Sequence, residues 1–198
     1  MWNMIELFYY QEIDLVAFYL KKIFHKNIMR IWIYWAAKKE DKREGILMII
    51  KKATENDLQE ILDLQYMAYQ SEAKLFNDPD IPPLKQTLPE VYSEYEKGIL
   101  LKALNEDGKI VGSVRAVCND DTAYIGKLIV HPDWQRKGIG TRLLLEIEQL
   151  CQRERCELFT STRSTGNIKL YERLGYVSFK ETAVNDELRF VYLEKSCR

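Results

Sequence analysis

The sequence predicts a single α/β (α+β) domain in which helices cover both faces of a mixed, mostly antiparallel sheet of about seven strands. Apolar segments typical of strands alternate with amphipathic helical segments in the order β-α-α-β-β-β-α-β-α-β-β. Tight-turn sequences such as Asn105-Glu106-Asp107-Gly108 join neighbouring strand segments and make those pairs antiparallel. No linker-like stretch interrupts residues 48–198, and no period of about 20–50 residues repeats. A second domain and a repeat architecture are therefore not expected.

The first half of the predicted domain is one strand followed by two helices. A strand is expected over residues 47–52, and Thr54 can cap the helix that follows it. Apolar residues repeat at helical spacing from Leu58 to Met67. Prolines and aspartates in residues 71–86 predict a loop. Residues 87–96 begin with a capping box that contains a proline, which predicts the second helix.

The second half alternates strands with two further helices. One amphipathic helix follows Gly140, and a shorter helix over 168–174 ends at Gly175, a residue typical of helix C-termini. Turn residues separate the strand segments. The expected strands are 99–105, 109–117, 122–130, 157–162, 176–183 and 187–194.

Composition and charge exclude several classes of protein. The net charge is −1, so no overall field attracts nucleic acid. The chain has only two histidines and no Cys-x-x-Cys pair, which argues against a structural metal site. Free thiols in a reducing cytoplasm are the simplest interpretation of the four cysteines, and the expected localisation is cytoplasmic. These cysteines are Cys118, Cys151, Cys156 and Cys197.

Residues 1–47 differ in composition from the rest because they are dense in aromatic residues. No apolar run in them reaches the roughly 18 residues that span a bilayer, so a membrane partner is not expected from such a run. Two interpretations remain open. The first is that the reading frame has a mis-assigned start and that the natural chain begins at Met48. The second is an amphipathic helix that lies on a membrane surface or on a partner.

The stretch Leu128–Arg142 carries the chemistry of the sequence. It runs from an apolar strand through a basic turn into a helix that starts with Gly138-Ile139-Gly140. Glycine lets a backbone approach a ligand closely, and the first N–H groups of a helix carry partial positive charge. Arg136 and Lys137 add full positive charges at the same place. The stretch therefore predicts an anion site, and phosphate is the usual anion at such a site.

Two familiar nucleotide motifs do not match this stretch. A Walker loop would end in Gly-Lys-Ser/Thr, but the chain has Gly140-Thr141-Arg142. A dinucleotide-binding motif would place a third glycine where Leu143 stands, and it belongs to a parallel sheet. A pyrophosphate cradle for an acyl-coenzyme A is the interpretation that remains.

Two blocks of the sequence resemble the GNAT superfamily of acetyl-CoA-dependent N-acetyltransferases. Residues 135–140, Gln-Arg-Lys-Gly-Ile-Gly, are similar to the family pattern Q/R-x-x-G-x-G/A after a strand that ends in Val-His-Pro. Residues 167–176 resemble the family's Asn…Tyr…Gly-aromatic segment. The resemblance covers about 48–195 and implies a GNAT-like fold for the domain 48–198.

The resemblance also implies a role for individual residues. Tyr171 would be the general acid beside the thioester sulfur, and Asn167 would contact the pantetheine arm or the reacting region. The remaining cofactor contacts are implied for Leu128, Ile129 and Val130, which would pair with the pantetheine arm, and for Gln135, Arg136, Lys137, Gly138, Ile139, Gly140 and Thr141, which would surround the pyrophosphate. No metal is implied.

The function implied by the resemblance is transfer of an acetyl group from acetyl-CoA to a primary amine of a small molecule or peptide, by direct attack in a ternary complex. The alternative is a non-catalytic acyl-CoA-binding sensor. Tyr124 and Glu90 are the candidates for the general base, and His131 is expected to be structural. Acidic residues between 71 and 98 form a candidate surface for a cationic acceptor. A homodimer is compatible with the resemblance.

Overall fold

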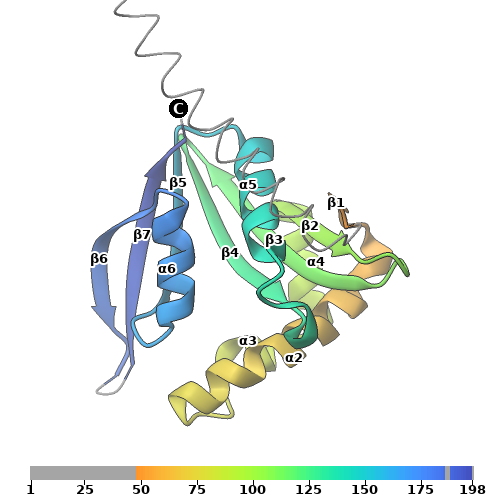
Figure 1. Ribbon diagram of the computed structural model, residues 1–198, viewed down its shortest axis with the longest axis horizontal. Helices are drawn as coiled ribbons and strands as arrows, with labels where there is room; N and C mark the ends of the chain where they lie inside the picture. The colour runs from red at the N-terminus through yellow and green to blue at the C-terminus, as the bar shows by residue number, and fades with distance from the viewer. Residues whose placement is uncertain (1–47, 186–187, 198) are drawn as a thin grey trace, which may run out of the picture. The chain divides into compact units, whose positions relative to one another are not determined.

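The computed structural model describes residues 48–185 and 188–197 (Figure 1). Both interpretations of residues 1–47 lie outside these described residues. The helices in chain order are η1 (Glu55–Asp57), α2 (Leu58–Phe76), α3 (Pro82–Lys85), α4 (Leu88–Lys97), η2 (Pro132–Trp134), α5 (Ile139–Cys151) and α6 (Thr165–Arg173). The strands are β1 (Ile49–Lys52), β2 (Ile99–Leu104), β3 (Ile110–Asn119), β4 (Thr122–Val130), β5 (Arg155–Ser161), β6 (Val177–Ala183) and β7 (Arg189–Ser196).

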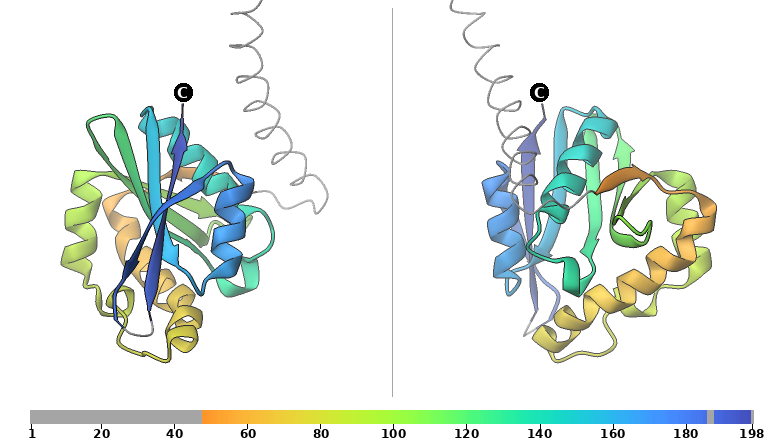
Figure 2. Two further views of the ribbon diagram at one scale, coloured as in Figure 1. Left: turned by 90° about the vertical axis from the view of Figure 1, so that its left-hand side faces the viewer. Right: turned by 45° about the vertical axis from the view of Figure 1, so that its right-hand side comes forward.

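The strands form one seven-stranded sheet in the order β1-β2-β3-β4-β5-β7-β6. Only β4 and β5 run parallel, and every other neighbouring pair is antiparallel. Figure 2 shows α2 and α4 on one side of the sheet and α5 and α6 on the other. The prediction of a mixed, mostly antiparallel sheet of seven strands with helices on both faces is confirmed.

The parallel pair β4–β5 is short. Its register contains three residue pairs, Thr122–Tyr124 with Arg155–Glu157, although β4 continues to Val130 and β5 to Ser161. Beyond these pairs the two strands diverge (Figure 1). In the described part of the chain, residues 125–130 therefore have no strand partner on the side of β4 that faces β5.

A β-bulge lies in the same part of β4. Arg115 of β3 is opposite Gly126, and Ser113 is opposite Ile129, so two residues of β4 face one residue of β3. Lys127, in the bulge, has a φ of 48°, which places it in the left-handed region that side chains rarely adopt. The bulge sends the Lys127 side chain to the α4 side of the sheet, where it contacts Glu94.

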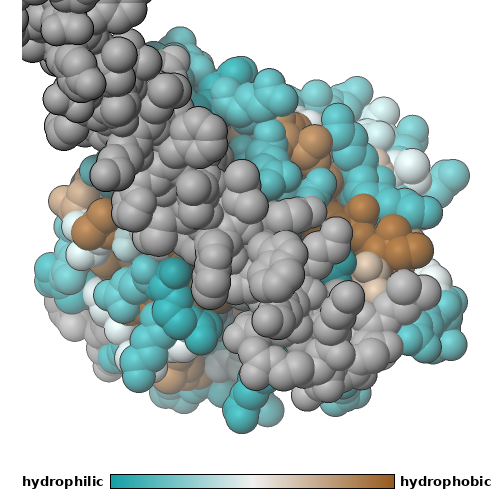
Figure 3. Space-filling model, turned by 45° about the horizontal axis from the view of Figure 1, so that its top comes forward, coloured by the Kyte–Doolittle hydropathy of each residue, from teal (hydrophilic) through white to brown (hydrophobic). Residues whose placement is uncertain are grey.

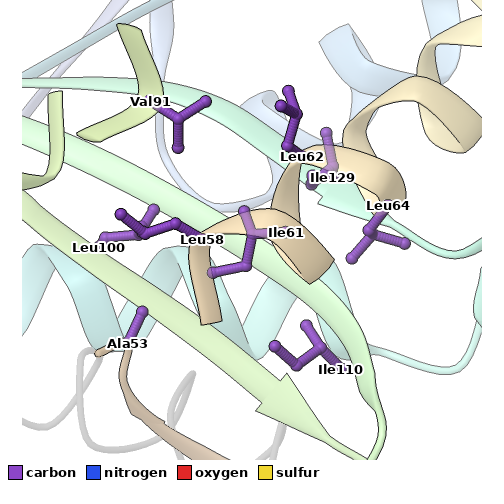
Figure 4. Packing of buried hydrophobic residues seen from close by; sticks show 9 residues of the cluster. All are labelled: Ala53, Leu58, Ile61, Leu62, Leu64, Val91, Leu100, Ile110 and Ile129. Atoms are coloured by element: carbon purple, nitrogen blue, oxygen red, sulfur yellow. The ribbon is translucent and has the colours of Figure 1, made fainter. Parts of the chain in front are cut away.

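The main core lies between α2 and the sheet. Figure 4 shows the α2 residues Leu58, Ile61 and Leu62 packed with residues of the strands. This cluster is lined by Ala53, Leu58, Ile61, Leu62, Leu64, Val91, Leu100, Ile110 and Ile129. On the other face, α5 buries the apolar stripe that its spacing predicts, which includes Leu143 and Ile147. The core therefore holds one helix against each face of the sheet, next to the part of β4 that has no strand partner.

On the face drawn in Figure 3, the coloured surface is mostly hydrophilic with separate hydrophobic patches. Large exposed apolar side chains include Val177 on the edge strand β6 and Phe159 on β5. Within the described residues, no helix is both long and apolar enough to cross a membrane.

The structure shortens the loop that was expected over 71–86. Helix α2 continues to Phe76 and ends where Asn77 adopts a left-handed conformation, and α3 forms within the remainder. The reason is local, because good helix formers fill residues 68–76 and the first strong breakers come at Asp78-Pro79. Helix α6 likewise begins at Thr165, before the expected Ile168.

The expectation of four free thiols is wrong for one pair. Cys156 and Cys197 form a disulfide with a Cα–Cα distance of 6.4 Å, although they are 41 residues apart in sequence. The antiparallel pairing of β5 with β7 brings them together, because Arg155 is opposite Ser196. Sequence spacing contains no signal for this pairing. Cys118 and Cys151 remain free.

Candidate functional site

The start of α5 forms a turn that exposes backbone N–H groups. Arg136 and Gly138 both have left-handed φ values, 61° and 78°. The Arg142 N–H donates to the Gly138 carbonyl at 3.0 Å, which is the first hydrogen bond of the helix. The N–H groups of residues 139–141 precede this bond and so have no acceptor within the helix. This geometry suits an anion.

Side chains around this turn hold its shape and add positive charge. The Gln135 side chain donates to the Val130 carbonyl at 3.2 Å. The Lys137 ammonium lies 4.7 Å from the centre of the Trp134 ring, and Arg136 is exposed. His131 accepts a hydrogen bond from the Asp133 N–H at 3.3 Å, which gives it the capping role expected of a structural histidine.

Gly140 is where this turn meets β4 and α6. A Cβ at Gly140 would lie 3.7 Å from Leu170, 3.8 Å from Val130 and 3.9 Å from Leu128. The structure therefore brings the predicted phosphate turn, the predicted pantetheine strand and α6 to one place. The cofactor roles of these residues stay predictions.

Helices α2 and α6 and strand β5 meet at the N-terminal end of α6. The Asn167 Nδ2 lies 3.3 Å from Glu72 Oε1 at the end of α2 and 3.4 Å from Thr160 Oγ1 on β5. Tyr171 follows one turn later in α6 and is buried. Burial, followed by the nearby charge of Glu72, raises the pKa of the Tyr171 phenol. The phenol is therefore protonated at neutral pH and can act as an acid but not as a base.

Glu72 and Tyr69 complete this cluster from α2. Burial raises the pKa of the Glu72 carboxyl, although the hydrogen bond from Asn167 opposes the rise. Tyr69 is partly buried, and its pKa is raised by burial of the phenol and then by Glu72 and Tyr171. The Tyr69 phenol also interacts electrostatically with Arg115 and Glu94, which belong to a second polar cluster.

The second cluster is a network of charged and amide side chains between α2, α4 and the bulge of β4. Glu94 forms ion pairs with Arg115 and Lys127, and the Lys127 ammonium lies 3.0 Å from Glu94 Oε1. The Arg115 guanidinium also donates to Gln65 Oε1 at 2.6 Å, and Gln65 in turn donates to Gln86 Oε1 at 3.0 Å. Arg115 Nε is buried and has no hydrogen-bond partner.

The charges of this network shift each other's pKa. Burial raises the pKa of Glu94, but the cations Arg115 and Lys127 outweigh burial and hold that pKa below its usual value. Burial and the Arg115 charge lower the pKa of Lys127. The network contains two cations and one carboxylate.

The structure changes the interpretation of the acidic residues between 71 and 98. Glu94 lies in an ion pair, and Asp80 pairs with Lys85 at 3.2 Å. Glu90 accepts hydrogen bonds from the Thr87 N–H and hydroxyl, which lower its pKa, so it serves as a helix cap. These groups do not form a uniform negative surface. Tyr124, the other candidate base, is 45% exposed on β4.

Sequence reasoning missed the α2 side of the site. Gln65, Tyr69 and Glu72 recur at i, i+4 and i+7, so they share one face of a helix. A polar and aromatic stripe on the buried face of an otherwise apolar helix is the signal that could have found them. The roles of Arg115 and Lys127 carry no such signal, because the bulge that places Lys127 cannot be located from the sequence pattern.

Comparison with known proteins assigns a family to this arrangement. The family model described as "Acetyltransferase (GNAT) family" matches residues 56–176, which include α2, the start of α5 and Tyr171. The chain belongs to the GNAT acetyltransferase family. The resemblance that rested on two blocks of sequence is therefore confirmed.

The individual proteins that resemble this chain are distant from it in sequence. The chain is 30% identical over 118 residues to the UPF0157 protein YqkA of Bacillus subtilis, which aligns 59% of this chain but only 34% of YqkA. It is 27% identical over 166 residues to S-(2-succino)cysteine N-acetyltransferase of Bacillus subtilis, covering 74% of this chain and 94% of the relative.

A solved structure shows the same fold. The PaiA N-acetyltransferase of Thermoplasma acidophilum, determined in complex with coenzyme A, has a TM-score of 0.63 at 17% identity. The match covers 76% of this chain and 99% of that protein.

The ion pairs of Glu94 generate a stability prediction. Glu94→Gln leaves Arg115 and Lys127 as neighbouring cations, so we expect it to lower the free energy of unfolding at pH 7 by about 1–3 kcal/mol in urea unfolding. This range is below that of a fully buried pair because the Glu94 side chain is 39% exposed.

The pH dependence of this difference follows from the lowered pKa of Glu94. A carboxyl with a depressed folded pKa stabilises the protein above its unfolded pKa and loses that contribution as the pH falls through the folded pKa. The difference between wild type and Glu94→Gln should therefore shrink below about pH 4. A difference that stays constant from pH 7 to pH 3 would contradict this assignment.

Proposed function

We propose that this GNAT-family chain is an N-acetyltransferase that moves an acetyl group from acetyl-CoA to a primary amine by direct attack in a ternary complex. The observation that carries the proposal is the free edge of β4 beyond Tyr124, which leads into the glycine-containing turn at the start of α5 and belongs to the same domain as the buried Tyr171. The proposed compartment is the cytoplasm, where thiols such as Cys118 and Cys151 stay reduced, and the Cys156–Cys197 disulfide is the one feature of the structure that a reducing compartment disfavours.

The residues present fit an acyl-coenzyme A. The N–H groups of residues 136–141 and the charges of Arg136 and Lys137 suit a pyrophosphate. The unpaired edge of Leu128–Val130 offers backbone donors and acceptors to the amide groups of a pantetheine arm. The related PaiA enzyme was determined with coenzyme A, which supports the same ligand here.

The reactive end supplies an acid and a base. Tyr171 would donate a proton to the departing thiolate sulfur, and its raised pKa keeps that proton available. Glu72 would accept the proton that the attacking amine loses, since burial raises the pKa of its carboxyl toward the range of a useful base. An N–H of β4 between Lys127 and Val130 would stabilise the negative charge on the carbonyl oxygen.

Direct attack is favoured by the side chains around the acceptor position. Those that contact Asn167 are Glu72 and Thr160, and neither is a thiol that would carry a covalent acetyl group. A free amine attacks a thioester without a covalent enzyme intermediate, because the thiolate is a good leaving group. The name of S-(2-succino)cysteine N-acetyltransferase supports a small-molecule acceptor.

The proposal is tested by release of coenzyme A from acetyl-CoA in the presence of a panel of primary amines, with the full chain. Release that depends on one class of amine, with the N-acetyl product identified by mass spectrometry, is the expected result. Tight binding of acetyl-CoA with no turnover on any amine would contradict the proposal and favour a non-catalytic acyl-CoA sensor.

Tyr171 provides a test of the acid. We expect Tyr171→Phe to lower kcat by roughly 10²-fold, since it removes the proton donor but keeps the ring in the core. Tyr92→Phe on α4, where Tyr92 is exposed, is the matched control and should leave kcat unchanged. Equal kcat in wild type and Tyr171→Phe would remove Tyr171 from the mechanism.

Gly140 provides a test of the ligand path. A Cβ there meets only ordinary contacts, so Gly140→Ala should bind coenzyme A like the wild type. Gly140→Leu extends the side chain toward Leu128 and Leu170, and we expect its Kd for coenzyme A to rise at least about tenfold in calorimetry, since a blocked contact of about 1.4 kcal/mol has that effect. Thermal unfolding of both variants checks the fold. Equal affinity of Gly140→Leu and Gly140→Ala for coenzyme A would show that the ligand does not bind at this turn.

A further inference from the structure

The α2 side of the site has one negative end and one positive end. Glu72 lies at the negative end with Asn167, and Lys127 and Arg115 lie at the positive end. Gln65, which bonds Arg115, and Glu72 are seven residues apart on α2, a rise of about 10 Å along the helix axis. Tyr69 stands between them in α2 and interacts electrostatically with both ends.

The positive end has more positive charge than its hydrogen-bonded partners neutralise. Arg115 and Lys127 share one bonded carboxylate, that of Glu94, while Gln65 and Gln86 are neutral, and the helix-capping Glu90 acts on Lys127 only through its charge, without a hydrogen bond. The buried Arg115 Nε also lacks a hydrogen-bond acceptor. A buried donor without an acceptor and an unbalanced buried charge are both unfavourable, and an added carboxylate would relieve the charge. Lys127, whose side chain is 24% exposed, is the more accessible cation.

The bulge places this cation beside the expected position of the thioester. Lys127 directly precedes Leu128, the first residue of the segment expected to hold the pantetheine arm. The Leu128 side chain lies on the Gly140 side, whereas the Lys127 side chain lies on the side of Glu94. A group bound by Lys127 would therefore lie on the acceptor side, close to the reacting carbonyl.

We propose that the acceptor is a free amino acid, with Lys127 binding its carboxylate and Glu72 facing its amine. This inference rests on the proposed function and names the class of acceptor for the same site. Glu72, Glu94, Arg115 and Lys127 carry two charges of each sign, which matches an acceptor with one ammonium and one carboxylate. A peptide N-terminus lacks the adjacent carboxylate and would leave the positive end unmatched.

The test compares amino acids with their carboxamides, which lack the carboxylate charge that Lys127 would bind. For the full chain, kcat/KM should favour the acid over the amide by about 10- to 100-fold, the range of a charge-assisted hydrogen bond. The same comparison of acid with carboxamide is made for α-amino acids and for longer ω-amino acids. The pair with the largest preference for the acid shows which separation of amine and carboxylate the site accepts.

A variant separates recognition from a structural role of Lys127. Lys127→Gln should abolish the preference for acid over amide, so that the ratio of the two kcat/KM values falls to about one even if both values change, since Gln still hydrogen-bonds but has no charge. Lys85→Gln is the matched control, because Lys85 also pairs with an acid, Asp80, and should keep the preference.

Three results would contradict the inference. Equal kcat/KM for acids and amides in the wild type overturns it, as does an equal loss for acids and amides in Lys127→Gln, which would give Lys127 a purely structural role. Preference for a peptide over the free amino acid also overturns it. If the wild type acetylates no amine at all, the proposed function fails first, and this outcome is distinct from the other three.

Discussion

The early end of the β4–β5 pairing is the constraint on which the site depends. Parallel strands normally continue their ladder, but here the register stops after Tyr124 and Glu157 while both strands go on. The buried helices α2 and α5 hold β4 from both faces, so the strand stays extended without a partner on that side. An edge of unpaired backbone groups inside a sheet is unfavourable unless a ligand or water satisfies it, and this is why we propose the edge as the binding surface for the pantetheine arm.

Neighbouring residues of α6 relate this edge to the proposed chemistry. Leu170 lies next to the position that a Cβ of Gly140 would take, and Tyr171 is the following residue, within the cluster of Glu72 and Asn167. One helix thus contacts the turn proposed to bind the pyrophosphate and carries the tyrosine proposed as the acid. On the opposite face, the network around Glu94 fixes the bulge of β4 and so fixes the direction of the strand N–H groups. Charges buried for this purpose stabilise the protein less than apolar packing would, and such charges are typical of functional sites.

Much of this fold could be predicted because local signals agreed with the tertiary structure. The alternating strand and helix patterns, the capping box at Thr87 and the glycines Gly138 and Gly140 at the start of α5 all depend on residues that are close together in the sequence. The β4 bulge, the Cys156–Cys197 pair and the contact of Glu72 with Asn167 join residues far apart in the chain or depend on register. Such features arise only after the strands pair, so no local pattern encodes them.

The most direct measurement is a crystal structure of the full chain with coenzyme A. The account predicts that pyrophosphate oxygens accept hydrogen bonds from the N–H groups of residues 136–141 and that the pantetheine arm lies along residues 128–130. It also predicts the sulfur beside Tyr171, with Glu72 and Lys127 on the acceptor side. Coenzyme A bound elsewhere, or β4 and β5 paired along their whole length in the complex, would contradict the account.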